Sequence, residues 1–149
     1  MGCDIHLHVE IKLKNNDSWH HYNHPKIDRW YKLFAKIANV RNYDEIGPIE
    51  PISQPKGFPH DASLTTKFDY DEWDCDAHSA SWLNSEEIKQ LAVWYRENTD
   101  NKKDFHGFEG QFGYLFGNSF EYFLKYKDGP NGGYPEELED VRFVFWFDN

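Results

Sequence analysis

Cysteine is scarce in this chain, which has only Cys3 and Cys75 among its 149 residues. Two cysteines without a Cys-x-x-Cys spacing cannot build a disulfide framework, so we expect a protein of a reducing compartment. No stretch approaches the roughly 20 apolar residues of a membrane-spanning helix. The N-terminus also lacks the basic region and the apolar run of a signal peptide. The sequence therefore predicts a cytoplasmic protein with no membrane association.

Basic residues are also few, because 16 Lys and Arg stand against 26 Asp and Glu and give a formal net charge of −10. Affinity for the backbone of DNA or RNA comes mainly from Lys and Arg, so a nucleic-acid polymer is a poor partner for this chain. A small anionic ligand such as a nucleotide stays compatible with the charge, because one local cation or metal ion can hold it.

Aromatic residues are abundant by contrast. They make up 18% of the chain, whereas all hydrophobic residues together reach only 39%. Each aromatic side chain buries a large area, so these residues can build one core in a chain of this length. We expect a single domain over residues 1–149. The sequence leaves open whether that domain forms a homo-oligomer.

Polar and apolar side chains alternate strictly over residues 4–11, a pattern typical of a half-buried β-strand. The polar face of this strand carries Asp4, His6, His8 and Glu10. Histidines two residues apart on a strand lean the same way, and imidazole and carboxylate groups bind ions such as Zn²⁺ or Mn²⁺. We predict that Asp4, His6 and His8 bind a divalent metal ion; the alternative is a polar face that only meets solvent.

The first strand is predicted to continue into a hairpin, with turn residues at 15–17 and a second arm at 18–22. His20, His21 and His24 lie on this arm or just after it. These histidines can reach the polar face of the first strand. The alternative is an exposed arm that is merely rich in histidine.

A second informative stretch, residues 69–82, holds five acidic residues and leads into a predicted helix over residues 85–97. Asn84 and Glu87 form a capping-box-like pair at the start of that helix. Free N–H groups at a helix N-terminus favour anions, so we place the end of this stretch in the site. The alternative is a capping loop without further function. The residues concerned are Asp76, His78, Ser79, Ser81 and Trp82.

These residues receive different expected roles. Asp76 or His78 completes the metal sphere that begins on the first strand, and His78 or Glu10 moves a proton during catalysis. Ser79, Ser81 and Trp82 are expected to contact the substrate. Every assignment outside residues 4–10 requires the two stretches to meet in one pocket.

Arg41 and Asn42 are further candidates for substrate binding. They directly follow a helix that is predicted to begin after Asp28 and to end near Asn39. An arginine at this position can hold a phosphate or carboxylate group through two parallel hydrogen bonds. It can equally pair with one of the many acidic side chains.

The last clear element is residues 141–148, which are apolar on both faces except at Arg142 and Asp148 and therefore predict a central strand. We predict an α+β fold with a mainly antiparallel sheet, the N- and C-terminal strands central and two or three helices on one face. Long irregular loops should cover the other face. The irregular or ambiguous segments are a proline-rich loop at 44–67, a glycine-rich connection at 98–113 and a short helix or strand at 119–127.

The opening Met-Gly-Cys-Asp-Ile-His-Leu-His-Val-Glu resembles a family of small uncharacterised proteins of bacteriophages and of phage-derived bacterial regions. The likeness extends to Arg41-Asn42, to Asp76-Ala77-His78-Ser79 and to the closing Phe145-Trp146-Phe147-Asp148-Asn149. This resemblance implies a phage origin and action in the cytoplasm of an infected bacterium, but it carries over no activity. A more distant likeness links Asp4-Ile5-His6 to the strand-end motifs of metal-dependent phosphoesterases and amidohydrolases.

These observations favour a small hydrolase that uses a divalent metal ion, such as Zn²⁺ or Mn²⁺, to cleave a phosphoester. The phage resemblance suggests as substrate a nucleotide or cyclic-nucleotide signal of a bacterial defence system. The alternative is a protein without chemistry that sequesters such a nucleotide, with tryptophans stacked on its base, or that inhibits a host defence protein. A structural phage protein is a third possibility.

Overall fold

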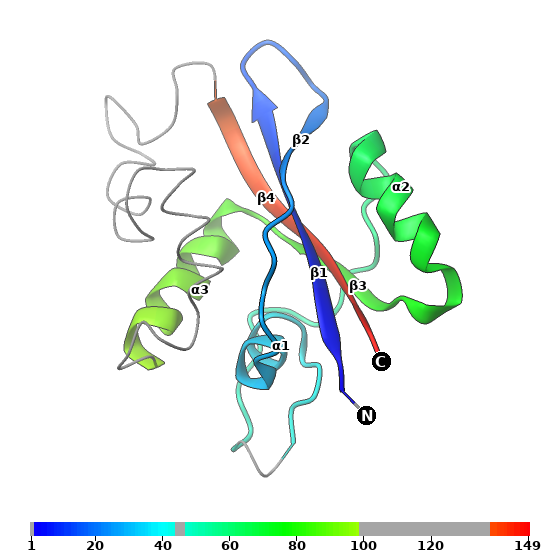
Figure 1. The fold of residues 1–149 in the computed structure, drawn as a ribbon. Coiled ribbons are helices and arrows are strands. Elements are labelled where there is room, and N and C mark those ends of the chain that lie inside the picture. The colour runs from blue at the N-terminus through cyan, green and yellow to red at the C-terminus, as the bar shows by residue number, and fades with distance from the viewer. Residues whose placement is uncertain (1, 44–46, 99–137) are drawn as a thin grey trace.

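The computed structural model describes residues 2–43, 47–98 and 138–149 (Figure 1). Four strands form one antiparallel sheet in the order β2-β1-β4-β3. The predicted α+β class is confirmed, and so is the central position of the first and last strands. The strands are β1 (Asp4–Leu13), β2 (Trp19–Asn23), β3 (His78–Leu83) and β4 (Leu138–Asp148).

The two central strands, β1 and β4, pair along their full lengths and give the sheet two different faces. On one face Ile5, Leu7 and Val9 stand opposite Phe147, Phe145 and Phe143, and all six side chains are buried. On the other face lie polar residues of β1 and their partners on β4. The pairs there are Asp4 with Asp148, His6 with Trp146, His8 with Val144 and Glu10 with Arg142.

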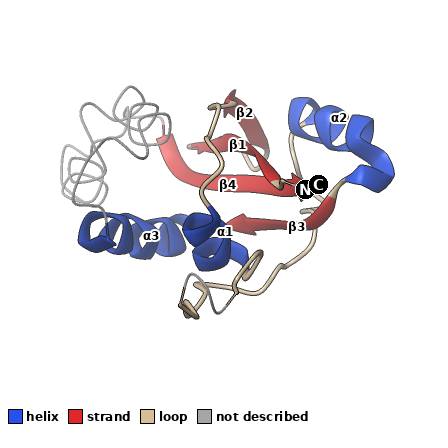
Figure 2. Ribbon diagram, turned by 60° about the horizontal axis from the view of Figure 1, so that its bottom comes forward, coloured by secondary structure: helices blue, strands red, loops and turns tan. Residues whose placement is uncertain are grey.

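The apolar face is covered by α1 (Tyr31–Ala38) and α3 (Ser85–Asn98), which lie on the same side of the sheet in Figure 2. Each helix turns an apolar stripe toward the sheet, as the sequence predicts. α1 contributes Leu33, Phe34 and Ile37 to the core, and α3 contributes Ile88, Leu91, Ala92 and Tyr95. The predicted capping pair at the start of α3 is also present, with Asn84 and Glu87 each accepting a hydrogen bond from the other's backbone N–H.

The polar face is covered by a third helix, α2 (Leu64–Trp73), which lies on the opposite side of the sheet from α1 and α3 (Figure 2). Ser63 caps it by accepting a hydrogen bond from the backbone N–H of Thr66. The expectation of irregular structure here was wrong. Leu64 and Phe68 are exposed and only Thr66 is buried, so no apolar stripe marks this helix in the sequence.

After α2 the chain forms a short 3₁₀ turn, η2 (Asp74–Asp76), and then enters β3 at the sheet edge. The sequence predicted a loop where β3 lies. The predictions for residues 99–137, including the short element at 119–127, fall outside the described residues. No helix in the described part of the chain is both long enough and apolar enough to cross a membrane.

Candidate metal centre

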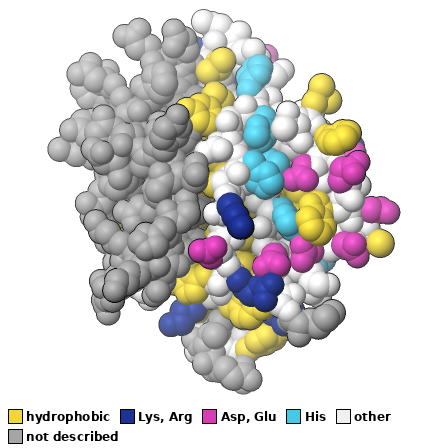
Figure 3. All heavy atoms as spheres, in the orientation of Figure 1, with side chains coloured by type: hydrophobic (Ala, Val, Ile, Leu, Met, Phe, Trp, Pro, Cys, Tyr) yellow, Lys and Arg dark blue, Asp and Glu magenta, His cyan; other side chains and the backbone are white. Residues whose placement is uncertain are grey.

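Each residue of the polar row of β1 has a side-chain partner; the row consists of Asp4, His6, His8 and Glu10. At its start Asp4 accepts two hydrogen bonds from the exposed Arg29 guanidinium, at 3.0 and 2.9 Å. His6 Nε2 lies 2.6 Å from Asp148 Oδ2, and the His6 ring packs on Trp73 with 4.1 Å between centroids. The predicted metal ligands Asp4 and His6 are thus each held by a charged partner. Figure 3 shows the histidines as a row across the described surface, with acidic side chains beside them.

His8 lies at the centre of this row and is the most enclosed of its histidines, with 1% of its surface exposed. Its Nε2 atom is 2.7 Å from Asp69 Oδ2 on α2, and its Nδ1 atom is 2.9 Å from His21 Nε2 on β2. The ring of His24 stacks on it at 3.9 Å with an interplanar angle of 22°. Side chains from three separate segments therefore meet at His8.

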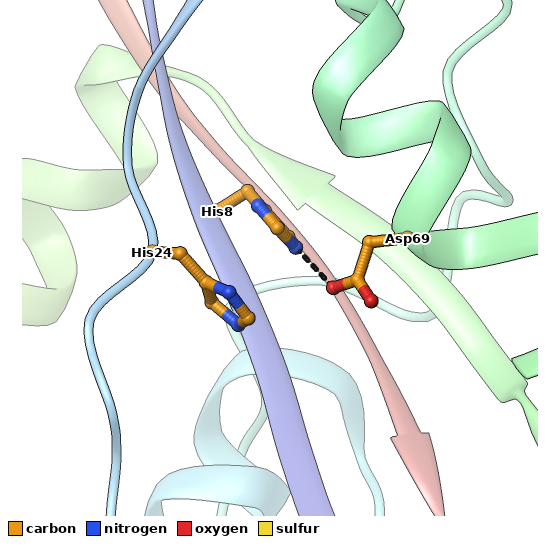
Figure 4. A group of neighbouring side chains, drawn as sticks. All are labelled: His8, His24 and Asp69. Carbon is orange, nitrogen blue, oxygen red and sulfur yellow. Dashed lines mark hydrogen bonds and ion pairs between the residues drawn. The ribbon is translucent and has the colours of Figure 1, made fainter. Parts of the chain in front are cut away.

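His8, His24 and Asp69 make up the metal-centre candidate, because each offers one ligand atom and these atoms all lie within 4.8 Å of one another (Figure 4). His24 is exposed and Asp69 is partly exposed, so the cluster opens to solvent on one side. Two histidines and one carboxylate are a ligand set found in catalytic Zn²⁺ and non-haem iron sites. Such a set leaves further coordination positions for water or substrate.

The electrostatics of the cluster suit metal binding, which requires neutral imidazole. Burial and, to a lesser extent, the neighbouring His24 lower the pKa of His8 to about 4. Their effect outweighs that of the hydrogen bond to Asp69, which raises it. Burial also lowers the pKa values of His21 and His24. These imidazoles are therefore uncharged at neutral pH, so each ring has one lone pair that can bind a metal ion.

Binding a shared ion requires the three ligand atoms to move to coordination distance. Neighbouring ligands of a tetrahedral ion, each about 2.0–2.2 Å from it, lie about 3.3 Å apart. The 2.7 Å contact between His8 Nε2 and Asp69 Oδ2 must therefore lengthen. A metal ion lies in the plane of the imidazole that binds it, so the stacked His24 ring must also turn. Its exposure leaves room for that turn.

Glu10, predicted to move a proton, is buried and takes part in three hydrogen bonds and an ion pair. Its Oε1 atom lies 2.9 Å from Arg142 Nε and 2.8 Å from Nη2 of the same guanidinium. Its Oε2 atom accepts hydrogen bonds from the Ser63 backbone N–H and the Thr66 hydroxyl, both at 2.8 Å. Burial alone would raise the pKa of Glu10, but these hydrogen bonds lower it overall. Glu10 thus connects the sheet to the first turn of the helix that carries Asp69.

Arg142 also contacts Asp61 and Trp19, a residue of the hairpin. Its Nη1 atom donates to Asp61 Oδ1 at 2.9 Å, and its guanidinium lies over the Trp19 ring at 4.2 Å. A cavity of about 660 Å³ opens beside these groups, between the hairpin and the start of α2. It is lined by His20 and His21 of β2, among others.

The structure does not bring the end of the acidic stretch to His8. His78 pairs with Phe147 in the sheet and so belongs to the opposite face from His6 and His8. Its Nε2 atom lies 2.7 Å from Asn149 Oδ1, and its Nδ1 atom lies 3.1 Å from Ser79 Oγ. The sheet thus separates His78 from the metal-centre candidate.

Ser81 and Trp82, near the end of that stretch, both contact Lys56 of the preceding loop. Ser81 is buried and its hydroxyl accepts a hydrogen bond from the Lys56 backbone N–H at 3.0 Å. The Lys56 ammonium lies over the Trp82 ring, 3.9 Å from its centroid. Asp76 is exposed in η2. The contacts of Ser81 and Trp82 with Lys56 hold the long loop against the edge strand β3.

Arg41 and Asn42 also lie away from the metal-centre candidate. Arg41 is near Cys3, a core residue, and its guanidinium carbon is 5.5 Å from the centroid of the Tyr31 ring. The Asn42 side chain exchanges two hydrogen bonds with the backbone of Ile49, at 2.7 and 3.0 Å. Asn42 thus joins the two sides of the loop after α1.

Sequence reasoning placed His8 in a metal site but did not assign His24 and Asp69 to it. A signal for His24 was present, because the histidine-rich arm was considered able to reach the first strand, with an exposed arm as the alternative. Asp69 carried no such signal, since its position depends on where α2 packs. Comparison with protein-family models, with curated proteins and with solved structures finds no match for this chain.

Proposed function

We propose that this chain is a metal-dependent hydrolase whose divalent ion is held by His8, His24 and Asp69. The observation that carries the proposal is the approach of three ligand atoms from β1, the segment after β2, and α2 to within 4.8 Å of one another. One ligand is buried and the other two reach solvent. A structural metal site is usually closed by four protein ligands, whereas a catalytic site keeps an open position.

The charge of the centre points to the substrate class. A divalent ion bound by two neutral imidazoles and one carboxylate keeps one net positive charge, which favours an anionic substrate over a neutral one. A cation in such a site lowers the pKa of water bound to it and withdraws charge from a phosphoryl oxygen. We therefore propose a phosphoester as substrate. The phage resemblance suggests that this phosphoester is a nucleotide or cyclic-nucleotide defence signal.

The first test is metal content and affinity. Protein prepared without a histidine tag is titrated with Zn²⁺ and Mn²⁺ by calorimetry, next to His24→Ala and a matched His20→Ala control. His24 is exposed, so its replacement should leave the fold intact. We expect about one ion per chain and a loss of affinity of at least about tenfold in His24→Ala only. Equal affinities in all three proteins would overturn the assignment.

The second test is activity. The metal-loaded protein is incubated with linear and cyclic nucleotides, and the products are separated by chromatography. Hydrolysis that is lost in both Asp69→Asn and His24→Ala supports the enzyme. Tight retention of an unmodified nucleotide would instead favour the sequestering protein. A lack of both hydrolysis and retention across the panel would refute the nucleotide assignment.

A further inference from the structure

His8 has a hydrogen-bonding partner at each ring nitrogen, and this fixes where its proton lies. The Asp69 carboxylate at Nε2 can only accept a hydrogen bond, and a neutral imidazole carries one N–H and one lone pair. Neutral His8 must therefore donate from Nε2 to Asp69 and accept at Nδ1. The partner at Nδ1 is His21 Nε2 at 2.9 Å, so His21 must donate from that atom.

Metal binding to His8 requires the opposite arrangement, because a cation at Nε2 needs the lone pair there. The N–H of neutral His8 then lies on Nδ1 and points at His21 Nε2, which must accept. We infer that His21 is a positioning residue for the proposed metal centre: the His8–His21 hydrogen bond reverses its direction when a divalent ion binds. This inference rests on the proposed function for the metal-bound state only.

The proton balance of this reversal closes. His8 gives up the proton on Nε2 and gains one on Nδ1, while His21 gives up the proton on Nε2 and gains one on Nδ1. Each ring carries one N–H before and after, so these two residues release no net proton. His21 lines the cavity between the hairpin and α2, where its ring can exchange protons with solvent.

The reversal restricts which side chain can stand at position 21. The group must donate to His8 Nδ1 without metal and accept from it with metal, as an imidazole or a carboxamide can. An apolar residue can do neither. The register of the hairpin places His21 opposite Glu10, on the face that carries His8, whereas His20 stands opposite Ile11. His20 is therefore a matched control on the same strand.

The direction of the bond can be read by NMR of the imidazole nitrogens at about pH 8, above the ordinary imidazole pKa of about 6.5. In metal-free protein we expect the N–H on Nε2 of both His8 and His21. Saturating Zn²⁺ should move both protons to Nδ1. A metal-free protein with the His8 proton on Nδ1 would overturn the inference. A correct metal-free pattern that Zn²⁺ leaves unchanged would overturn the reversal and, if no Zn²⁺ binds, the proposed function as well.

Variants test the positioning role. Loss of a hydrogen-bonding partner behind a metal ligand lowers metal affinity by about 10–100-fold. We expect such a loss in His21→Leu and near-normal affinity in His21→Gln and His20→Leu. Equal losses in His21→Leu and His21→Gln would refute the hydrogen-bonding role, and so would equal losses in His21→Leu and His20→Leu. If His21→Leu does not fold, the comparison of His21→Gln with wild type and the metal-free NMR pattern still decide the matter.

Discussion

Glu10 and Arg142 stand opposite each other on the two central strands and form a buried ion pair, with 2.8 Å between Oε1 and Nη2. Both side chains have at most 5% of their surface exposed. The second carboxylate oxygen of Glu10 binds the first turn of α2. This pair therefore joins the sheet to the helix that supplies Asp69, and its integrity should matter for both stability and metal binding.

Glu10→Gln should destabilise the protein by about 3 kcal/mol, because it leaves Arg142 buried with its main counter-charge removed. Urea unfolding measures this change in the free energy of unfolding. The control is Asp71→Asn, which breaks an ion pair with Lys67 whose side chains are more than half exposed. That change should cost less than about 1 kcal/mol. Similar losses in the two variants would show that the buried pair has no special role.

Acid should weaken the metal-free protein in a window set by His8. Burial lowers the pKa of His8 to about 4, whereas an unfolded histidine titrates near about 6.5. Between these values the unfolded chain binds a proton that the folded chain does not, so the free energy of unfolding falls as pH drops. The His8 contribution should reach about 3 kcal/mol and then level off below about pH 4.

Urea titrations in the presence of a chelator, from about pH 7 to about pH 4, measure this acid dependence. His8→Gln is the informative comparison, because a carboxamide can still donate to Asp69 and accept from His21 but does not titrate in this range. Its free energy of unfolding should fall less steeply than that of the wild type. Identical slopes would show that His8 titrates normally in the folded state.

Asp69→Asn tests the carboxylate ligand with little change in shape. The carboxamide oxygen can still accept the hydrogen bond from His8 Nε2, so the fold should be kept. Loss of the negative charge should weaken Zn²⁺ binding by at least about tenfold. Asp71→Asn, on the same helix, should bind Zn²⁺ as the wild type does. Calorimetric titration of the two variants side by side would contradict the assignment if both bound equally well.

Ser63→Ala should lower stability by about 1 kcal/mol, because it removes the side-chain cap of α2. The backbone N–H of Ser63 still binds Glu10 in this variant, so the helix should remain on the sheet. Hydrogen exchange should show faster opening of the first turn of α2, with β1 and β4 unchanged. Uniformly faster exchange across the whole sheet would mean that the cap supports the global fold instead.

The two central strands of the sheet were predictable because their signals are local, whereas the edge strand β3 was predicted as a loop. Strict alternation over residues 4–11 and the apolar run of residues 141–148 each define a strand without reference to the rest of the chain. The patterns predict one buried side for β1 and two for β4. Strands buried to this extent are expected next to each other at the centre of a sheet. The predictions for α1 and α3 succeeded for the same reason, since each has an apolar stripe at helical spacing.

The metal-centre candidate was only partly predictable because its members meet through packing over long sequence distances. His8 and Asp69 are 61 residues apart, and their contact depends on how α2 lies on the polar face. That placement is set by Glu10 and by aromatic packing of Tyr70 on Trp146, not by a pattern within α2. His78 had a strong chemical signal, but its strand register turned it to the other face.

The pairing of β1 with β4 has a consequence for how the protein forms during synthesis. His6 and Asp148 are 142 residues apart, so the sheet cannot close until the chain has been translated through β4. Contacts of such long range are slow to form and leave apolar strands exposed meanwhile. Until β4 has been made, β1 can pair with β2 along one backbone edge while its other edge lacks a partner strand.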